Sequence, residues 1–142
     1  TVAVDLSSGM LRRAAQRAQK LRLSGHLVQM AAEALAFPNE AYDWVVATFV
    51  FCSVADPVAG FRELARVCKP NGTILLLEHV RIDRPVVGRL MDIVNPLAVR
   101  LTGANINRRT VENVRRAGLS LVSVESLSRT GLVKLITARP ST

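Results

Sequence analysis

An acidic residue directly after a short apolar run is the most informative chemical feature of this sequence. Asp5 follows residues 2–4, a run that is typical of a buried parallel strand. A carboxylate at the carboxyl end of such a strand can accept hydrogen bonds from the ribose hydroxyls of a nucleotide. Taken alone, however, Asp5 more often serves as a helix-capping or loop acid, so this residue by itself does not decide the function.

Metal and disulfide chemistry are not indicated by the cysteines and histidines. Cys52 and Cys68 lie in apolar contexts, and no pair of cysteines or histidines has the spacing of metal ligands. The two other possible ligands, His26 and His79, are isolated. We therefore predict no metal site, and two free thiols in a reducing, cytoplasmic setting.

Alternating strands and helices must position any site in this chain. The predicted strands occupy residues 2–4, 26–30, 44–51, 73–77, 119–127 and 132–138, and the predicted helices occupy residues 10–22, 57–68, 85–101 and 110–117. Asp56 and Thr110 are expected to cap helices, Gly25 to end one in a left-handed turn, and Pro96 to break or kink another. Residues 69–72 are expected to form a turn. This order predicts an α/β fold with a mainly parallel sheet and an antiparallel hairpin formed by the last two strands.

Charge and length restrict the class of protein. The 142 residues carry 19 basic and 11 acidic side chains, which gives a net charge of +8, and only 4% of them are aromatic. The arginines are scattered in pairs on different predicted helices, which disfavours a nucleic-acid binder. A solvated basic surface is the simplest explanation, and an anionic partner such as lipid or RNA is the alternative. No apolar run is long enough to span a membrane.

Five motifs, in order and at sensible spacings, give the chain a family resemblance. They are Val4-Asp5-Leu6-Ser7-x-x-Met10-Leu11, Ala32-Glu33-x-Leu35-x-Phe37-Pro38, Tyr42-Asp43-x-Val45, Asp56-Pro57 and Leu64-x-Arg66-Val67-x-Lys69-Pro70-x-Gly72. Over nearly its whole length the chain resembles the class I S-adenosylmethionine-dependent methyltransferases. It is most similar to the branch of ubiquinone/menaquinone-biosynthesis and phosphatidylethanolamine N-methyltransferases. Residues 48–54, with Glu78-His79-Val80, also resemble thiol methyltransferase-like members.

The resemblance implies a set of cofactor-binding residues and two catalytic candidates. Asp5 would hold the ribose hydroxyls, with Leu6 and Met10 near the adenine, Ala31 and Ala32 at the adenine edge, Thr48 and Phe49 at the methionine end, and Ser53 at a position whose role stays open. For Leu6, Met10 and Phe49, ordinary core packing is the alternative. His79 is the best candidate for a general base, and Glu78 is the second. A plain polar role at the end of a strand explains His79 as well.

The resemblance also implies that part of the domain lies before residue 1. The family's first strand and its glycine-rich cofactor loop have no counterpart in residues 1–142, and that strand occupies the centre of the family's Rossmann-like sheet. We therefore expect residues 1–142 to form a partial methyltransferase domain with open strand edges. Such a chain is expected to fold poorly alone or to bind S-adenosylmethionine weakly. Residues 81–109 would form a lid or substrate segment.

The implied function is methyl transfer from S-adenosylmethionine to a small, lipophilic acceptor: an amine, a thiol, a quinone or a phospholipid head group. Arg81, Arg84, Arg89 and Arg100 surround the apolar face of the helix at 85–101, which suits a lipid-like substrate and peripheral contact with an anionic membrane. A plain lid helix is the alternative for that segment. Two other functions stay open, an NAD-type oxidoreductase and a non-catalytic basic binding domain. The sequence predicts no particular oligomeric state.

Overall fold

Strands and helices alternate along the chain as predicted. The computed structural model describes residues 1–82 and 84–141. The strands are β1 (Val2–Asp5), β2 (His26–Gln29), β3 (Tyr42–Thr48), β4 (Cys68–His79), β5 (Leu119–Ser126) and β6 (Val133–Pro140). The helices are α1 (Ser8–Lys20), α2 (Pro57–Val67), α3 (Pro85–Thr102) and α4 (Thr110–Arg116).

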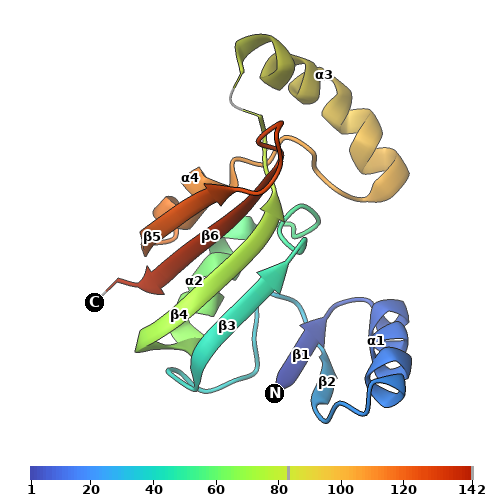
Figure 1. Cartoon of the computed structure of the whole chain (residues 1–142), viewed down its shortest axis with the longest axis vertical. Coiled ribbons are helices and arrows are strands. Elements are labelled where there is room, and N and C mark those ends of the chain that lie inside the picture. The colour runs from blue at the N-terminus through green and yellow to red at the C-terminus, as the bar shows by residue number, and fades with distance from the viewer. Residues whose placement is uncertain (83, 142) are drawn as a thin grey trace.

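The strands form two sheets (Figure 1). β1 and β2 pair in parallel, and a four-stranded sheet has the order β3-β4-β6-β5. In the larger sheet β3 and β4 are parallel, whereas β6 is antiparallel to both β4 and β5. The predicted α/β fold with an antiparallel C-terminal hairpin is therefore confirmed. Within the described residues, β1 and β3 do not pair with each other.

Helix α1 begins and ends differently from the prediction. It is capped by Ser7, whose hydroxyl accepts a hydrogen bond from the Met10 amide at 3.3 Å. It ends at Lys20, and Arg22, not Gly25, takes the left-handed conformation, with φ of 53°. The amides of Arg22 and Leu23 bond back to the last turn of the helix, which is the Schellman ending. These two hydrogen bonds stabilise the left-handed conformation at a residue that is not glycine.

Two other predicted boundaries differ in detail from the structure. β3 ends at Thr48 and does not continue to Phe51, because Phe49 has φ of 54° and turns the chain. Residues 69–72 belong to the span of β4, but the chain turns back there, since Gly72 lies close to Cys68. The register passes from Tyr42↔Cys68 to Trp44↔Thr73, so these four residues bulge out of the ladder.

The hydrophobic core lies between the four-stranded sheet and helices α2 and α4. Its centre includes Ile74, Leu76 and Ile136 from the sheet and Val114 from α4, all of them fully buried. Helix α2 adds Phe61, whose ring stacks on Phe51 at a centroid distance of 3.8 Å. Asp56 caps α2 as predicted, since its carboxylate accepts from the amides of Val58 and Ala59 at 3.0 Å. Phe51 and Val54 belong to this core, so it holds in place the chain that follows β3, near the candidate site.

Helices α3 and α4 follow β4, and α3 projects away from the sheet (Figure 1). Helix α3 continues through Pro96, so the residue does not break it. Most of its large apolar side chains are exposed. No helix among the described residues has the length and apolar content needed to cross a membrane. Thr110 is the first residue of α4 rather than its cap, because Arg109 occupies the capping position without a side-chain hydrogen bond.

Candidate active site

The predicted site residues gather at the carboxyl ends of four strands. The arrows of β1, β3 and β4 point the same way in Figure 1, and β2 is parallel to β1. Asp5 ends β1, Thr48 ends β3 and His79 ends β4. Glu78 lies on β4, and Leu6, Ala31, Ala32 and Phe49 lie one to three residues after a strand. Met10 lies in the first turn of α1, and Ser53 lies in the loop between β3 and α2. Ligands of open α/β sheets bind at this edge.

Asp5 makes the local contact of a turn and keeps an oxygen available. Its Oδ1 accepts a hydrogen bond from the Ser7 amide at 2.7 Å, which holds the turn between β1 and α1. The other carboxylate oxygen forms no hydrogen bond with any described residue. Gln29 fixes the same turn from β2, because its Nε2 donates to the Leu6 carbonyl at 3.0 Å. Asp5 therefore serves in the turn while it can still accept a hydrogen bond from a ligand.

Three apolar residues around this edge do not belong to the core. Leu6 is 67% exposed, Met10 is 50% exposed and Phe49 is 43% exposed. Within the described residues, these three side chains therefore lie outside the buried core. A nucleotide base can pack on exposed apolar surface, and its ribose hydroxyls can donate to a carboxylate beside it. Ala31 and Ala32 follow β2 and are half-buried.

Glu78 is buried and supports the turn after β3. Its side chain is 0% exposed, and its Oε1 accepts from the amides of Val50 and Phe51 at 2.9 and 3.3 Å. Its Oε2 is buried and has no hydrogen-bond partner among the described residues. Burial raises the pKa of this carboxyl, although the two amide hydrogen bonds oppose the shift. The position of Phe49 therefore depends on a residue on the neighbouring strand.

His79 is exposed and lies against the same turn. Its ring contacts that of Phe49 at a centroid distance of 4.5 Å, with 37° between the planes. Ser53 is exposed, and its hydroxyl donates to the Val50 carbonyl at 3.0 Å. Cys52 donates its thiol to the Phe49 carbonyl at 3.3 Å, and burial, followed by the charge of Glu78, raises the pKa of this thiol. Of these residues, His79 presents a polar group outward.

Two residues that the sequence did not single out as functional hold the loop after β2 in place. Glu33 Oε1 accepts from the amides of Ala55 and Asp56 at 3.1 and 3.3 Å. Arg66 donates to the carbonyls of Leu35 and Phe37, both at 2.7 Å, and also pairs with Glu63. Their role depends on contacts between residues at least 22 positions apart, so no local pattern could have identified it.

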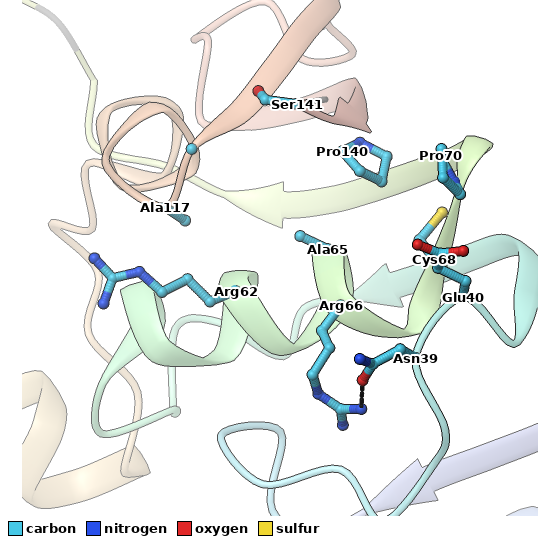
Figure 2. A pocket seen from close by; sticks show the side chains of 11 residues that line it. Asn39, Glu40, Arg62, Ala65, Arg66, Cys68, Pro70, Ala117, Pro140 and Ser141 are labelled. Carbon is cyan, nitrogen blue, oxygen red and sulfur yellow. Dashed lines mark hydrogen bonds between the residues drawn. The ribbon is translucent and has the colours of Figure 1, made fainter.

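A cavity of about 430 Å3 lies at the opposite end of the four-stranded sheet. It opens between the C-terminal ends of α2 and α4 and the first residues of β4 (Figure 2). Arg66 lines it, but its guanidinium is already bonded to Asn39 at 2.8 Å and to Glu63. The cavity is therefore remote from Asp5 and His79 and adds nothing to the candidate site.

Comparison with known proteins gives the family. A family model described as a methyltransferase domain matches residues 1–76, more than half of the chain. The chain belongs to the S-adenosylmethionine-dependent methyltransferase family. The phosphatidylethanolamine N-methyltransferase of Cereibacter sphaeroides is 36% identical over 83 residues, which are 57% of this methyltransferase chain and 41% of the relative. The ubiquinone/menaquinone biosynthesis C-methyltransferase UbiE of Pseudoalteromonas translucida is 32% identical over 90 residues, 62% of this chain and 36% of that protein.

Solved structures agree on the fold of this methyltransferase chain. The cyclase SpnF matches with a TM-score of 0.79 and 22% identity, over 99% of this chain and 66% of the other. A SAM-dependent methyltransferase from Aquifex aeolicus matches with a TM-score of 0.72 and 17% identity, over 99% and 68%. At these identities the likeness shows the fold alone. The chain spans less than half the length of the two curated relatives it matches.

Proposed function

We propose that this chain is the part of a methyltransferase that binds the ribose and adenine of S-adenosylmethionine and contributes to the acceptor site. The observation that carries the proposal is Asp5 with its available carboxylate oxygen at the end of β1, followed in the chain by the exposed side chains of Leu6 and Met10. A carboxylate accepts from vicinal hydroxyls, and the apolar surfaces suit a flat base. These residues therefore fit the cofactor that the family uses.

The remaining predicted residues extend this site toward the transferred methyl group. When bound, S-adenosylmethionine supplies an electrophilic methyl group for an in-line displacement, whose rate depends chiefly on how the acceptor is placed. Thr48 and Phe49 would line the methionine end, with Ser53 supporting the turn that carries Phe49. Ala31 and Ala32 would border the adenine edge through their backbone.

We assign the two catalytic candidates different roles. His79 is exposed, lies 4.5 Å from the Phe49 ring centroid and can accept a proton from an amine or hydroxyl acceptor. Glu78 is buried and already accepts two backbone amides, so it acts as a positioning residue for the turn at 49–51. A thiolate acceptor would need no base and would depend only on the positioning.

A lipophilic acceptor is the substrate class that the surroundings favour. The segment at 81–109 contains α3, whose apolar residues are exposed beside Arg84, Arg89 and Arg100. The names of the two curated relatives refer to phosphatidylethanolamine and to ubiquinone or menaquinone. We therefore propose that this segment meets the lipid-like acceptor, in peripheral contact with an anionic membrane surface.

The cofactor site is tested by titration calorimetry with S-adenosylhomocysteine. Asp5→Ala removes the carboxylate that binds the ribose, so we expect the affinity to fall at least about tenfold, as for the loss of charge-assisted hydrogen bonds. Asp43→Ala is the matched control, since Asp43 is an exposed acid that pairs with Lys69 at the other end of β3. Equal affinity of the Asp5→Ala variant and the wild type would contradict the assignment. Binding of NADH in place of S-adenosylhomocysteine would favour the oxidoreductase alternative.

A further inference from the structure

A second cavity, of about 260 Å3, is lined mainly by cationic side chains. It lies where α4 begins, beside the last residue of β4 and the start of β6. Its cationic residues are Arg81, Arg108, Arg109, Arg115 and Lys134, and the one carboxylate among its described lining residues is Glu112. Converging guanidinium groups of this kind suit an anion with several oxygens.

Arg108 is a half-buried cation of this basic pocket. It forms no ion pair with any described residue, and its Nη2 donates to the Val54 carbonyl at 2.6 Å. Its Nε is buried and has no hydrogen-bond partner among the described residues. A buried donor without an acceptor is unfavourable, and an anion bound beside it would supply one. Arg108 is therefore held in place by Val54 while keeping its positive charge.

The carboxylates near the pocket do not neutralise it. Asp92 forms its ion pair with Arg81, at 2.9 Å. Among the described residues, it forms no ion pair with the other cationic residues that line the pocket. Glu112 approaches Arg109 only to 3.6 Å, and both side chains are more than half exposed. Exposed pairs at such distances contribute little. The exposed guanidinium of Arg115 forms no ion pair with a described residue, so Arg108 and Arg115 both bring to the pocket a positive charge that no described carboxylate pairs with.

We propose that this basic pocket is an anion site that binds a phosphate group. Arginine donates planar, paired hydrogen bonds that match phosphate oxygens. The volume is below the roughly 300–1,000 Å3 of pockets that enclose whole drug-sized ligands, so the pocket fits a head group and not a complete lipophilic molecule. The phosphate can belong to a soluble compound or to a phospholipid whose chains remain outside.

The basic pocket is separate from the proposed cofactor site. Val80 lines the pocket and is buried, whereas the preceding residue, His79, is exposed and contacts Phe49. Successive residues of an extended chain point to opposite sides. Binding of phosphate therefore does not depend on methyl transfer, and the two proposals can fail independently.

Titration calorimetry with inorganic pyrophosphate tests this site in the wild-type protein and in a double variant, Arg109→Gln with Arg115→Gln. Both residues are exposed, so the changes leave the core intact, and circular dichroism checks the fold. We expect the affinity to fall at least about tenfold, since two charge-assisted contacts are lost. Arg116→Gln is the matched control: it is an exposed arginine on the same helix that does not line the pocket.

A second arm of the experiment distinguishes the source of the phosphate. Soluble short-chain phosphatidic acid replaces pyrophosphate in the same titrations. Tighter binding of the lipid, with the same loss in the double variant, assigns the site to a phospholipid head group, and equal binding assigns it to phosphate-bearing compounds in general. Absence of binding of either probe to the wild type, or an equal loss in the Arg116→Gln variant, would overturn the proposal.

Discussion

Glu78 illustrates how one buried side chain determines the geometry of the candidate site. It lies on β4 yet bonds the amides of the turn after β3, and this turn carries Phe49 with its φ of 54°. The carboxyl has lost its hydration, and its second oxygen has no partner among the described residues. Burial therefore raises its pKa above the ordinary value of 4.5. The ionised form is less favourable in the folded chain than in the unfolded chain.

This shift predicts a pH dependence of stability that depends on Glu78. A raised pKa means that the folded state holds its proton more tightly, so the contribution to stability is complete below pH 4.5 and is lost as the pH rises through the folded-state pKa. The glutamine of Glu78→Gln cannot ionise, so the stability of this variant does not decrease with pH for this reason. We expect the free energy of unfolding of Glu78→Gln, relative to wild type, to increase with pH above about 4.5. Urea unfolding at a series of pH values measures the difference.

Glu63→Gln provides a control of opposite sign. Its hydrogen bond to Arg66 lowers the pKa of the Glu63 carboxyl, so this group stabilises the fold above its unfolded-state value and loses that effect as the pH falls. Relative to wild type, Glu63→Gln should therefore become less stable as the pH rises through the acid range. A difference between Glu78→Gln and wild type that stays constant with pH would contradict the burial argument.

Individual site residues were predictable only where their role depends on neighbours in the sequence. Asp5 ends an apolar strand, and its hydrogen bond with the Ser7 amide confirms its interpretation as a loop acid. Its interpretation as a ribose ligand stays a prediction. Glu33 and Arg66 gave no such signal, because their partners lie 22 to 31 residues away. Glu78 was identified as a possible base, but its role depends on the amides of Val50 and Phe51, which lie 28 and 27 residues earlier in the chain.

At the scale of elements, the sequence located the strands and helices better than it located their ends. Apolar periodicity identified the strands and helices that the described residues form, because apolar side chains recur with the period of each element even where, as in α1, none of them is buried. The ends depend on tertiary contacts. Phe49 turns the chain after β3 because Glu78 accepts the next two amides, and Arg22 replaces Gly25 because two backbone hydrogen bonds close the helix first. A local sequence pattern identifies neither Glu78 nor these backbone hydrogen bonds.

Helix α3 presents an exposed apolar stripe. Its exposed apolar residues, Val86, Leu90, Ile93, Leu97 and Leu101, recur at spacings of three and four, so they share one face. Arg89 and Arg100 lie one turn from Ile93 and Leu97 and flank that face. An apolar stripe with flanking cations suits the surface of an anionic membrane, where both groups gain favourable contacts.

This arrangement predicts binding to vesicles of phosphatidylglycerol and phosphatidylcholine. The double variant Leu90→Asp with Leu97→Asp places two charges in the stripe, so we expect the bound fraction in a sedimentation assay to fall at least about fivefold. Leu21→Asp is the control, since Leu21 is equally exposed but follows α1. A wild-type protein that leaves the vesicles unbound, or an equal loss in Leu21→Asp, would contradict the membrane role of α3.

The whole molecule combines a high positive charge with an uncovered sheet face. Helices α2 and α4 pack on one face of the four-stranded sheet, where Ile74, Leu76 and Ile136 are buried. On the other face Trp44 and Val46 of β3 are each 63% exposed. Contiguous apolar surface promotes association, whereas a net charge of +8 opposes it through mutual repulsion. The balance between the two effects depends on ionic strength.

We therefore expect the chain to self-associate as salt is added, because ions screen the repulsion and leave the apolar attraction in place. Trp44→Thr with Val46→Thr places residues of high strand propensity at both positions of β3 while it removes most of the exposed apolar surface. Sedimentation velocity at low and high salt should show a rise in mean mass for the wild type and a smaller rise for this variant. Val86→Thr, an exposed apolar position on α3, controls for a general loss of hydrophobicity. A mass that is independent of salt in the wild type would show that the open sheet face does not govern the association of the molecule.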